Sequence, residues 1–301
     1  MRICAIDIGT NSIRQLICDI DNENVNKIQK DVEITRLGEG ISKTGKLNNN
    51  AIQRSIEVIE HFVELAQEKG AEVIYAFATS AMRDAKNKDA FFEQIGKLGL
   101  EVEIIDGETE SLFGYIGAVM GVNKEDALVL DIGGGSTELA YKGREFVKES
   151  FDIGAVRLTE KFIKNDPPTT EEYDEIRLHI IDAVVNSIDK YKEVENVIGI
   201  GGTITTLAAV SQQLEIYSQE KVHGYQLKKE EIKRILDKFM SVTLEERKKI
   251  FGLQPQRADI IIAGTAILLT ILEMLSFKEI TVSEWDNLEG AVLYKFGEFK
   301  L

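Results

Sequence analysis

The chain is short of cysteine, of basic residues and of long apolar runs, and each shortage excludes a class of protein. Two cysteines in 301 residues, Cys4 and Cys18, are too few for a disulfide-stabilised scaffold and favour a reducing cytoplasm. The 36 basic residues are outnumbered by 51 acidic ones, and a net charge of −15 argues against a nucleic-acid partner. The longest uncharged apolar run, residues 260–272, is shorter than the roughly 20 residues of a membrane helix, so no membrane partner is expected.

The remaining composition is that of a globular protein. Hydrophobic residues make up 44% of the chain, which excludes wholesale disorder, and Asp7 comes too early for the apolar core of a signal peptide. A length of 301 residues allows two domains, each with its own core.

Strand and helix patterns alternate along the chain. Strands are expected at residues 2–8, 12–19, 25–37 (one or two), 73–78, 101–105, 127–131, 197–200 and 279–283, with a hairpin of 137–141 and 145–151. Helices are expected at 52–66, 89–98, 108–120, 170–191, 203 onward, 228–240, 255–275 and 288–296. This order predicts an α/β fold with mixed sheets.

A segment near the N-terminus is repeated 124 residues later. Residues 5–12 and 129–136 each read as a buried strand, an aspartate, a glycine turn and a hydroxyl residue. Two copies at this separation predict two similar domains facing each other across a cleft. The boundaries we expect are residues 1–122 for the first domain, with a C-terminal helix of about 288–301 packing back on it, and 123–287 for the second.

Three glycine-containing turns follow hydrophobic strands and are candidate phosphate sites. Glycine lets the backbone approach a ligand closely, and successive amide groups in such a turn bind anions. A single turn of this kind is more often only a turn, but three favour phosphate, and none is a Walker loop. The residues concerned are Gly9, Thr10, Asn11 and Ser12; Gly133, Gly134, Gly135, Ser136 and Thr137; and Gly201, Gly202 and Thr203.

Carboxylates accompany these turns. Asp7 and Asp131 end strands at equivalent points of the repeat, and Glu138 follows the second turn. Carboxylates beside phosphate would repel it unless a bridging Mg²⁺, or Mn²⁺, removed the conflict. Alternatively, either aspartate caps its own turn.

Motifs spread over nearly the whole chain resemble those of the exopolyphosphatase / guanosine pentaphosphate phosphohydrolase (Ppx/GppA) family. They are residues 7–14, 79–83 with Asn87, 131–138, 154–160, 201–203 and 257–261. The resemblance implies an actin-like, sugar-kinase-like fold. It also implies Mg²⁺-dependent release of the terminal phosphate of polyphosphate or the 5′ γ-phosphate of pppGpp, and a possible homodimer.

The resemblance also suggests individual roles. The family's catalytic glutamate aligns with Glu110, with Thr109 where another glutamate is usual; without the family, Glu110 would be an ordinary acidic residue at a helix N-terminus. Arg14, Arg83 and Arg157 lie in matched motifs and are candidate phosphate contacts. Arg257 could equally be structural, and the loop residue His223 could touch substrate or have no special role.

The chain departs from the family pattern in two places. In the C-terminal motif at residues 282–290, Asp286 replaces a glycine and Leu288 replaces an arginine, so one potential anion-binding charge is absent. The chain also lacks the helical region of longer members, which favours short polyphosphates or nucleotides as substrates. Two other functions stay open: a non-catalytic sensor of polyphosphate or guanosine tetraphosphate, and an actin-like-fold kinase.

Overall fold

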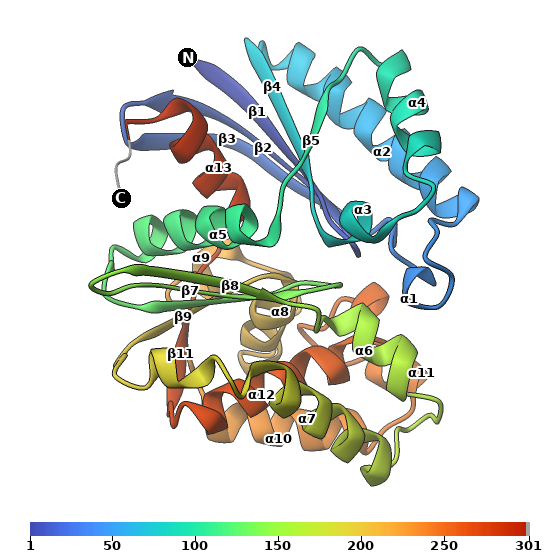
Figure 1. Ribbon diagram of the computed structural model, residues 1–301, viewed down its shortest axis with the longest axis vertical. Coiled ribbons are helices and arrows are strands. Elements are labelled where there is room, and N and C mark those ends of the chain that lie inside the picture. Colours follow the sequence, from blue (N-terminus) through green and yellow to red (C-terminus); the bar gives the residue numbers. More distant parts are fainter. Residues whose placement is uncertain (299–301) are drawn as a thin grey trace. The chain divides into compact units, whose positions relative to one another are not determined.

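The computed structural model describes residues 1–298, which form two compact units (Figure 1). Unit 1 comprises Met1–Gly117 together with Asp286–Leu301, and unit 2 comprises Ala118–Trp285. Residues 299–301, which the sequence assigns to the terminal helix segment, lie outside the described residues. Within residues 1–298, no helix is long and apolar enough to cross a bilayer.

Unit 1 is built on a five-stranded mixed sheet in the order β3-β2-β1-β4-β5. Its strands are β1 (Arg2–Ile8), β2 (Ile13–Asp21), β3 (Asn24–Glu33), β4 (Val73–Ala78) and β5 (Val102–Ile104). Strands β1, β2 and β3 pair antiparallel, whereas β1, β4 and β5 pair parallel.

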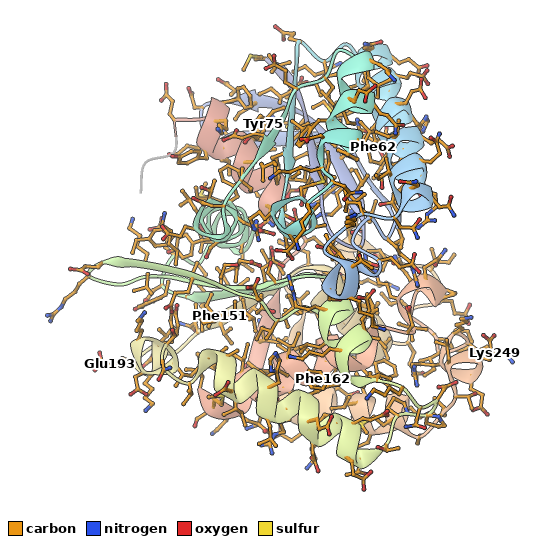
Figure 2. The ribbon with its side chains drawn as sticks, turned by 45° about the vertical axis from the view of Figure 1, so that its right-hand side comes forward. Phe62, Tyr75, Phe151, Phe162, Glu193 and Lys249 are labelled. Carbon is orange, nitrogen blue, oxygen red and sulfur yellow. The ribbon has the colours of Figure 1, made fainter. Side chains whose placement is uncertain are left out.

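Helices cover both faces of this sheet. They are α1 (Ile41–Thr44), α2 (Asn49–Glu68), α3 (Ser80–Asp84), α4 (Asp89–Lys97), α13 (Asn287–Phe296) and the start of α5 (Gly107–Val122), which continues into unit 2. Helix α2 begins at Asn48, whose side chain caps it, and buries an apolar stripe that includes Phe62, labelled in Figure 2. The other face packs against α13 and Phe113 of α5.

Helix α13 lies unusually close to α5. A Cβ at Gly290 would collide with the carbonyl oxygen of Phe113, and one at Gly117 would collide with that of Asp286. Glycine is therefore required at both positions, and the contact holds the start of α13 against the helix that carries Glu110.

The sheet of unit 2 has the order β10-β11-β9-β6-β7-β8. Its strands are β6 (Leu128–Ile132), β7 (Thr137–Lys142), β8 (Phe146–Phe151), β9 (Val197–Ile200), β10 (Gln226–Lys228) and β11 (Glu279–Val282). The run β11-β9-β6-β7-β8 repeats the order and the pairing directions of β5-β4-β1-β2-β3. The sequence repeat thus corresponds to one sheet topology used twice, and the expected α/β class with mixed sheets is confirmed.

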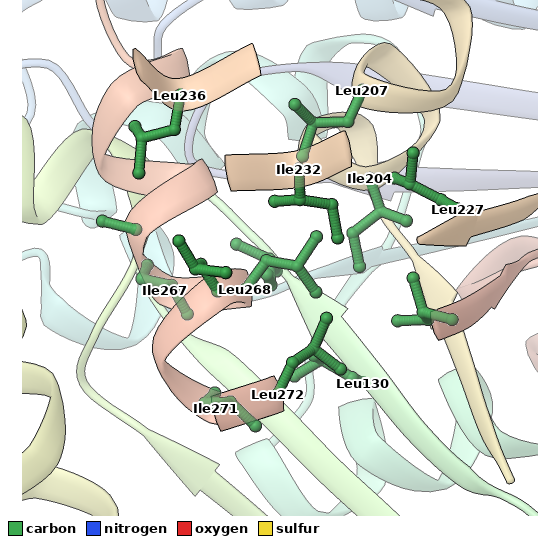
Figure 3. Packing of buried hydrophobic residues seen from close by; sticks show 14 of the residues in the cluster. Leu130, Ile204, Leu207, Leu227, Ile232, Leu236, Ile267, Leu268, Ile271 and Leu272 are labelled. Carbon is green, nitrogen blue, oxygen red and sulfur yellow. The ribbon is translucent and has the colours of Figure 1, made fainter. Parts of the chain in front are cut away.

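The core of unit 2 centres on α12 (Ile261–Met274), which is apolar on nearly all sides (Figure 3). Side chains from β6, α8 and α10 converge on it, among them Leu130, Leu207 and Ile232. Full burial of such a side chain is worth roughly 1.5–3 kcal/mol. The other helices are α6 (Ala155–Phe162), α7 (Thr170–Val184), η1 (Ile188–Tyr191), α8 (Gly202–Ser211), α9 (Gln219–Val222), α10 (Lys229–Met240), α11 (Leu244–Arg247) and η2 (Pro255–Arg257).

Some expected elements differ in extent. The helix predicted over residues 170–191 ends at Val184, and the chain resumes as the short η1 after Ser187, whose hydroxyl donates to Glu149. The helix predicted over 255–275 is divided into η2 and α12. Helices α3 and α6, inside two of the motifs that resemble the family, were not predicted.

The two cysteines are buried and unlinked. Cys4 lies opposite Ile17 and Cys18 lies opposite Ile3, and they pack into separate clusters. Burial raises the pKa of each thiol to about 12, so neither is a ready nucleophile. Both therefore pack as small apolar residues.

Candidate phosphate and metal site

Asp131 and Glu138 are brought together in unit 2. They lie directly opposite each other in the antiparallel pair of β6 and β7, so their side chains share one face of the sheet. Both are buried, and Ser150 of β8 donates a 2.7 Å hydrogen bond to Oε1 of Glu138. Two adjacent buried carboxylates with oxygen donors fit a hard divalent cation that keeps water or phosphate oxygens as its other ligands.

The turn after β6 is locked by hydrogen bonds through its carbonyl groups. The amide of Ala155 donates to the oxygen of Gly133, and the amides of Val156 and Arg157 donate to the oxygen of Gly134. Nε of Arg157 donates to the oxygen of Gly135 at 2.7 Å. The predicted phosphate contact Arg157 therefore lies on the predicted phosphate turn.

The turn after β1 in unit 1 has the same inner hydrogen bond. The amide of Gly9 donates to the oxygen of Ser12, and the amide of Gly133 donates to the oxygen of Ser136, each at 3.0 Å. Nδ2 of Asn11 is buried and has no hydrogen-bond partner among residues 1–298. An unused buried donor of this kind is suited to an anion.

The third turn, after β9, lies beside Asp131. Gly201 has a φ of +89°, and a Cβ there would come within 2.6 Å of Oδ1 of Asp131. Strands β9, β6 and β7 are neighbours in the sheet. The third turn and both carboxylates therefore lie at the same end of these strands. Arg257 packs its guanidinium on Gly202, at the start of α8. The sequence left this arginine undecided, and nothing in its local pattern reports the contact.

Glu110 and Arg83 meet in unit 1. Nη1 of Arg83 donates to the oxygen of Ile105 at 3.0 Å and to Oε2 of Glu110 at 2.8 Å. Glu110 is 7% exposed and lies in the first turn of α5, where Oδ1 of Asp106 accepts from the amide of Thr109. The helix start and the arginine together fix the orientation of this carboxylate.

Asp7 and Arg14 occupy in unit 1 the positions that Asp131 and Glu138 occupy in unit 2. They lie opposite each other in β1 and β2 and form a salt bridge. Burial raises the pKa of Asp7, although Arg14 acts in the opposite direction. The pair in unit 1 has a cation supplied by the chain, whereas the pair in unit 2 consists of two acids. Oδ1 of Asp7 is buried and has no hydrogen-bond partner within the described chain.

Several contacts of this region were not visible in the sequence. Arg14 also pairs with Asp286, and Lys30 pairs with Asp286 and Glu289.

His223 has both ring nitrogens engaged with backbone, at the oxygen of Gly121 and the amide of Glu284. Within residues 1–298, no three side chains of His, Cys, Asp or Glu cluster as a complete metal-binding set.

A profile of the Ppx/GppA phosphatase family matches residues 16–298. The chain is 32% identical to exopolyphosphatase 2 of Mycobacterium tuberculosis, over 97% of this chain and 98% of that protein. It is 36% identical to a bifunctional 3-dehydroquinate synthase/phosphatase of Fusobacterium nucleatum, over 96% of this chain but 46% of that protein. It is 30% identical to a guanosine-5′-triphosphate,3′-diphosphate pyrophosphatase of Photobacterium profundum, over 96% of this chain and 58% of that one.

Solved structures of similar proteins have the same fold as this chain. The Ppx/GppA family member of Aquifex aeolicus superposes with a TM-score of 0.81 at 36% identity, covering 98% of this chain and 97% of its own. An exopolyphosphatase of Cytophaga hutchinsonii superposes with a TM-score of 0.89 at 30% identity, covering 98% and 97%. These matches agree with the duplicated sheet topology and confirm an α/β fold with two mixed sheets of the Ppx/GppA type. The chain belongs to the Ppx/GppA phosphatase family.

Proposed function

We propose that the chain is a metal-assisted phosphoanhydride hydrolase. It releases terminal orthophosphate from inorganic polyphosphate, the 5′ γ-phosphate of pppGpp, or both. The names of the mycobacterial and Photobacterium relatives support these two substrate classes. The observation that carries the proposal is Glu110, a buried carboxylate on the first turn of a helix whose orientation is fixed by Arg83.

Glu110 is the proposed general base. It orients a water molecule and removes its proton as the water attacks the terminal phosphorus in line with the leaving oxygen. Arg83 acts on Glu110 through its salt bridge and adds positive charge for the substrate's phosphates. The carboxylate is acceptor-only when ionised, so a fixed rotamer decides which water it can hold.

The residues proposed to bind phosphate are those of the three turns and three arginines. Amide groups of the turns donate to phosphate oxygens, and Asn11 adds a side-chain donor. Arg157, fixed by Gly135, holds the leaving chain. The full set is Gly9, Thr10, Asn11, Ser12, Arg14, Arg83, Gly133, Gly134, Gly135, Ser136, Thr137, Arg157, Gly201, Gly202 and Thr203.

Ppx/GppA phosphatases are phosphoryl-transfer enzymes and are generally metal-dependent. Asp131 and Glu138 would hold the ion, which we propose to be Mg²⁺ with Mn²⁺ as a substitute, and Ser150 would orient Glu138. When bound, the ion offsets charge on the phosphate oxygens. Asp7, at the equivalent point of the repeat in unit 1, is also proposed as a metal ligand; its Oδ1 is buried and has no hydrogen-bond partner among residues 1–298.

Four further predictions made from the sequence remain proposals. They are a cytoplasmic location, a homodimer, no nucleic-acid partner, and a preference for short polyphosphates or nucleotides. The two free buried cysteines support the reducing compartment.

Orthophosphate release from purified protein tests the proposed function. Short-chain polyphosphate, long-chain polyphosphate and pppGpp are compared, each with Mg²⁺, with Mn²⁺ and with a chelator. We expect release from at least one substrate, lost on chelation and restored by adding metal. No release from any substrate would overturn the proposal, and binding without release would assign a sensor instead. Nucleotide turnover that requires an added acceptor would assign a kinase.

A further inference from the structure

Five charged groups of unit 1, of which Arg14 is the most exposed, form one network. Nη1 of Arg14 lies 2.7 Å from Oδ2 of Asp286, and Arg14 also pairs with Asp7. Nζ of Lys30 lies 3.3 Å from the same Oδ2 and 2.8 Å from Oε1 of Glu289. Within unit 1, these ion pairs join three carboxylates, those of Asp7, Asp286 and Glu289, to two cations.

Asp286 is the carboxylate that gives the network one more negative than positive charge. Without it, Asp7 with Arg14 and Lys30 with Glu289 would form two neutral pairs. Burial opposes ionisation of Asp286, but Arg14 and Lys30 outweigh burial and lower its pKa. The structure thus holds a charged carboxylate between two cations that already have partners.

The two oxygens of Asp286 have different tasks. Oδ1 accepts from the amide of Leu288 at 3.0 Å and caps α13, a task that Ser or Asn would perform as well. Oδ2 contacts both cations. The cap does not require a charge, so the charge-specific task is the contact with Arg14 and Lys30. The position is also where the family pattern has a glycine, which can form neither contact.

Arg14 has no guanidinium nitrogen outside these ion pairs. Nε and Nη2 donate to Oδ2 of Asp7, and Nη1 donates to Oδ2 of Asp286. Its side chain is still 17% exposed. A phosphate oxygen that approaches Arg14 must share or replace a carboxylate, and Asp286, held through a single nitrogen, is the easier one to replace.

We propose that Asp286 is a specificity-determining residue that competes with substrate phosphate for the guanidinium of Arg14. This inference rests on the proposed function, in which Arg14 is a phosphate contact. Asp286 weakens the binding of highly charged anions and does not act on the reacting bond. Its removal therefore lowers KM and leaves kcat nearly unchanged.

The test uses Asp286→Ser and Asp286→Asn, both of which retain a helix cap. Tripolyphosphate binding without metal is measured by calorimetry, and KM and kcat are measured with polyphosphate and Mg²⁺. We expect Kd and KM to fall about 10-fold, the value of one charge-assisted contact. In the Arg14→Gln background the same substitutions should change neither constant. Asp19→Ser, which removes an exposed carboxylate paired with Arg2, controls for net charge and should leave Kd unchanged.

The outcomes distinguish a failure of the proposed function from a failure of the role of Asp286. If the wild type binds tripolyphosphate but releases no phosphate, the proposed function fails, while the calorimetric comparison still tests Asp286. Unchanged or weaker binding in both Asp286 variants would overturn the role of Asp286. A gain in affinity that persists without Arg14 would overturn it as well.

Discussion

Nη1 of Arg83 lies 2.8 Å from Oε2 of Glu110 and at the same time donates to the carbonyl oxygen of Ile105. The guanidinium is thereby anchored to backbone and carboxylate at once, so the orientation of Glu110 depends on a second, fixed point of the chain. Arg83 is a positioning residue for Glu110 as well as a proposed phosphate contact.

Arg83→Lys should lower kcat about 10²-fold, because an ammonium cannot reproduce both contacts and a displaced base is costly. Thermal stability should change little, because lysine keeps a positive charge beside the buried Glu110. Steady-state kinetics and a melting curve check both statements.

Arg54 provides the matched control. It also donates to a backbone oxygen, that of Thr35, and pairs with a carboxylate, Glu39, but both side chains of this pair are exposed. Arg54→Lys should leave kcat within about twofold. Equal kinetics for the Arg83 and Arg54 variants would show that Arg83 does not position the base.

Gly290→Ala should destabilise unit 1 by about 1–3 kcal/mol or more, because the new methyl group meets the oxygen of Phe113 and forces α13 away from α5. Gly96→Ala is the control: in α4 a Cβ there meets nothing within 4 Å. It should leave stability unchanged or raise it by about 0.5–1 kcal/mol. Denaturant unfolding of both variants distinguishes a collision from a general intolerance of alanine.

Glu149 makes stability depend on acid pH. Burial acts to raise the pKa of its carboxyl, but hydrogen bonds from Lys190, Tyr191 and Ser187 outweigh burial and lower it below the ordinary 4.5. The charged form is thus favoured in the folded state. Its stabilisation is present above about pH 4.5 and is lost as pH falls through the lowered folded value.

Glu149→Gln should lower the free energy of unfolding at pH 7 by about 1–3 kcal/mol. The free energy of unfolding should also fall less steeply between neutral pH and the acid range in this variant than in the wild type. Glu145→Gln, in the exposed β7–β8 turn, should do neither. An unfolding series against pH with an identical decline for wild type and Glu149→Gln would refute this assignment.

The sequence predicted the strands of the repeat well because each is a short buried run that ends at an aspartate and a glycine turn. Strand β1 has the predicted bounds, and β6 begins and ends one residue later than predicted. The pairing of Asp131 with Glu138 follows from the hairpin and was within reach of the sequence.

The long-range contacts of Asp286 could not be predicted from the sequence. Arg14 meets Asp286 across 272 positions, and Lys30 meets Asp286 across 256. Neither strand nor helix periodicity reports such a pairing, so Asp286 was visible only as a departure from the family motif. The role of Glu110 likewise came from the resemblance, because an acidic residue at a helix start is ordinary by itself.

Orthophosphate release by Glu110→Gln, beside wild type and Glu108→Gln, tests the central claim most directly. Glu108 is an exposed residue in the same first turn, so its variant carries the same change of charge. With folding verified by circular dichroism, the account predicts a loss of about 10²–10⁴-fold for Glu110→Gln and nearly full activity for Glu108→Gln. A Glu110→Gln protein that keeps its rate within a few-fold of wild type would contradict a base at this position.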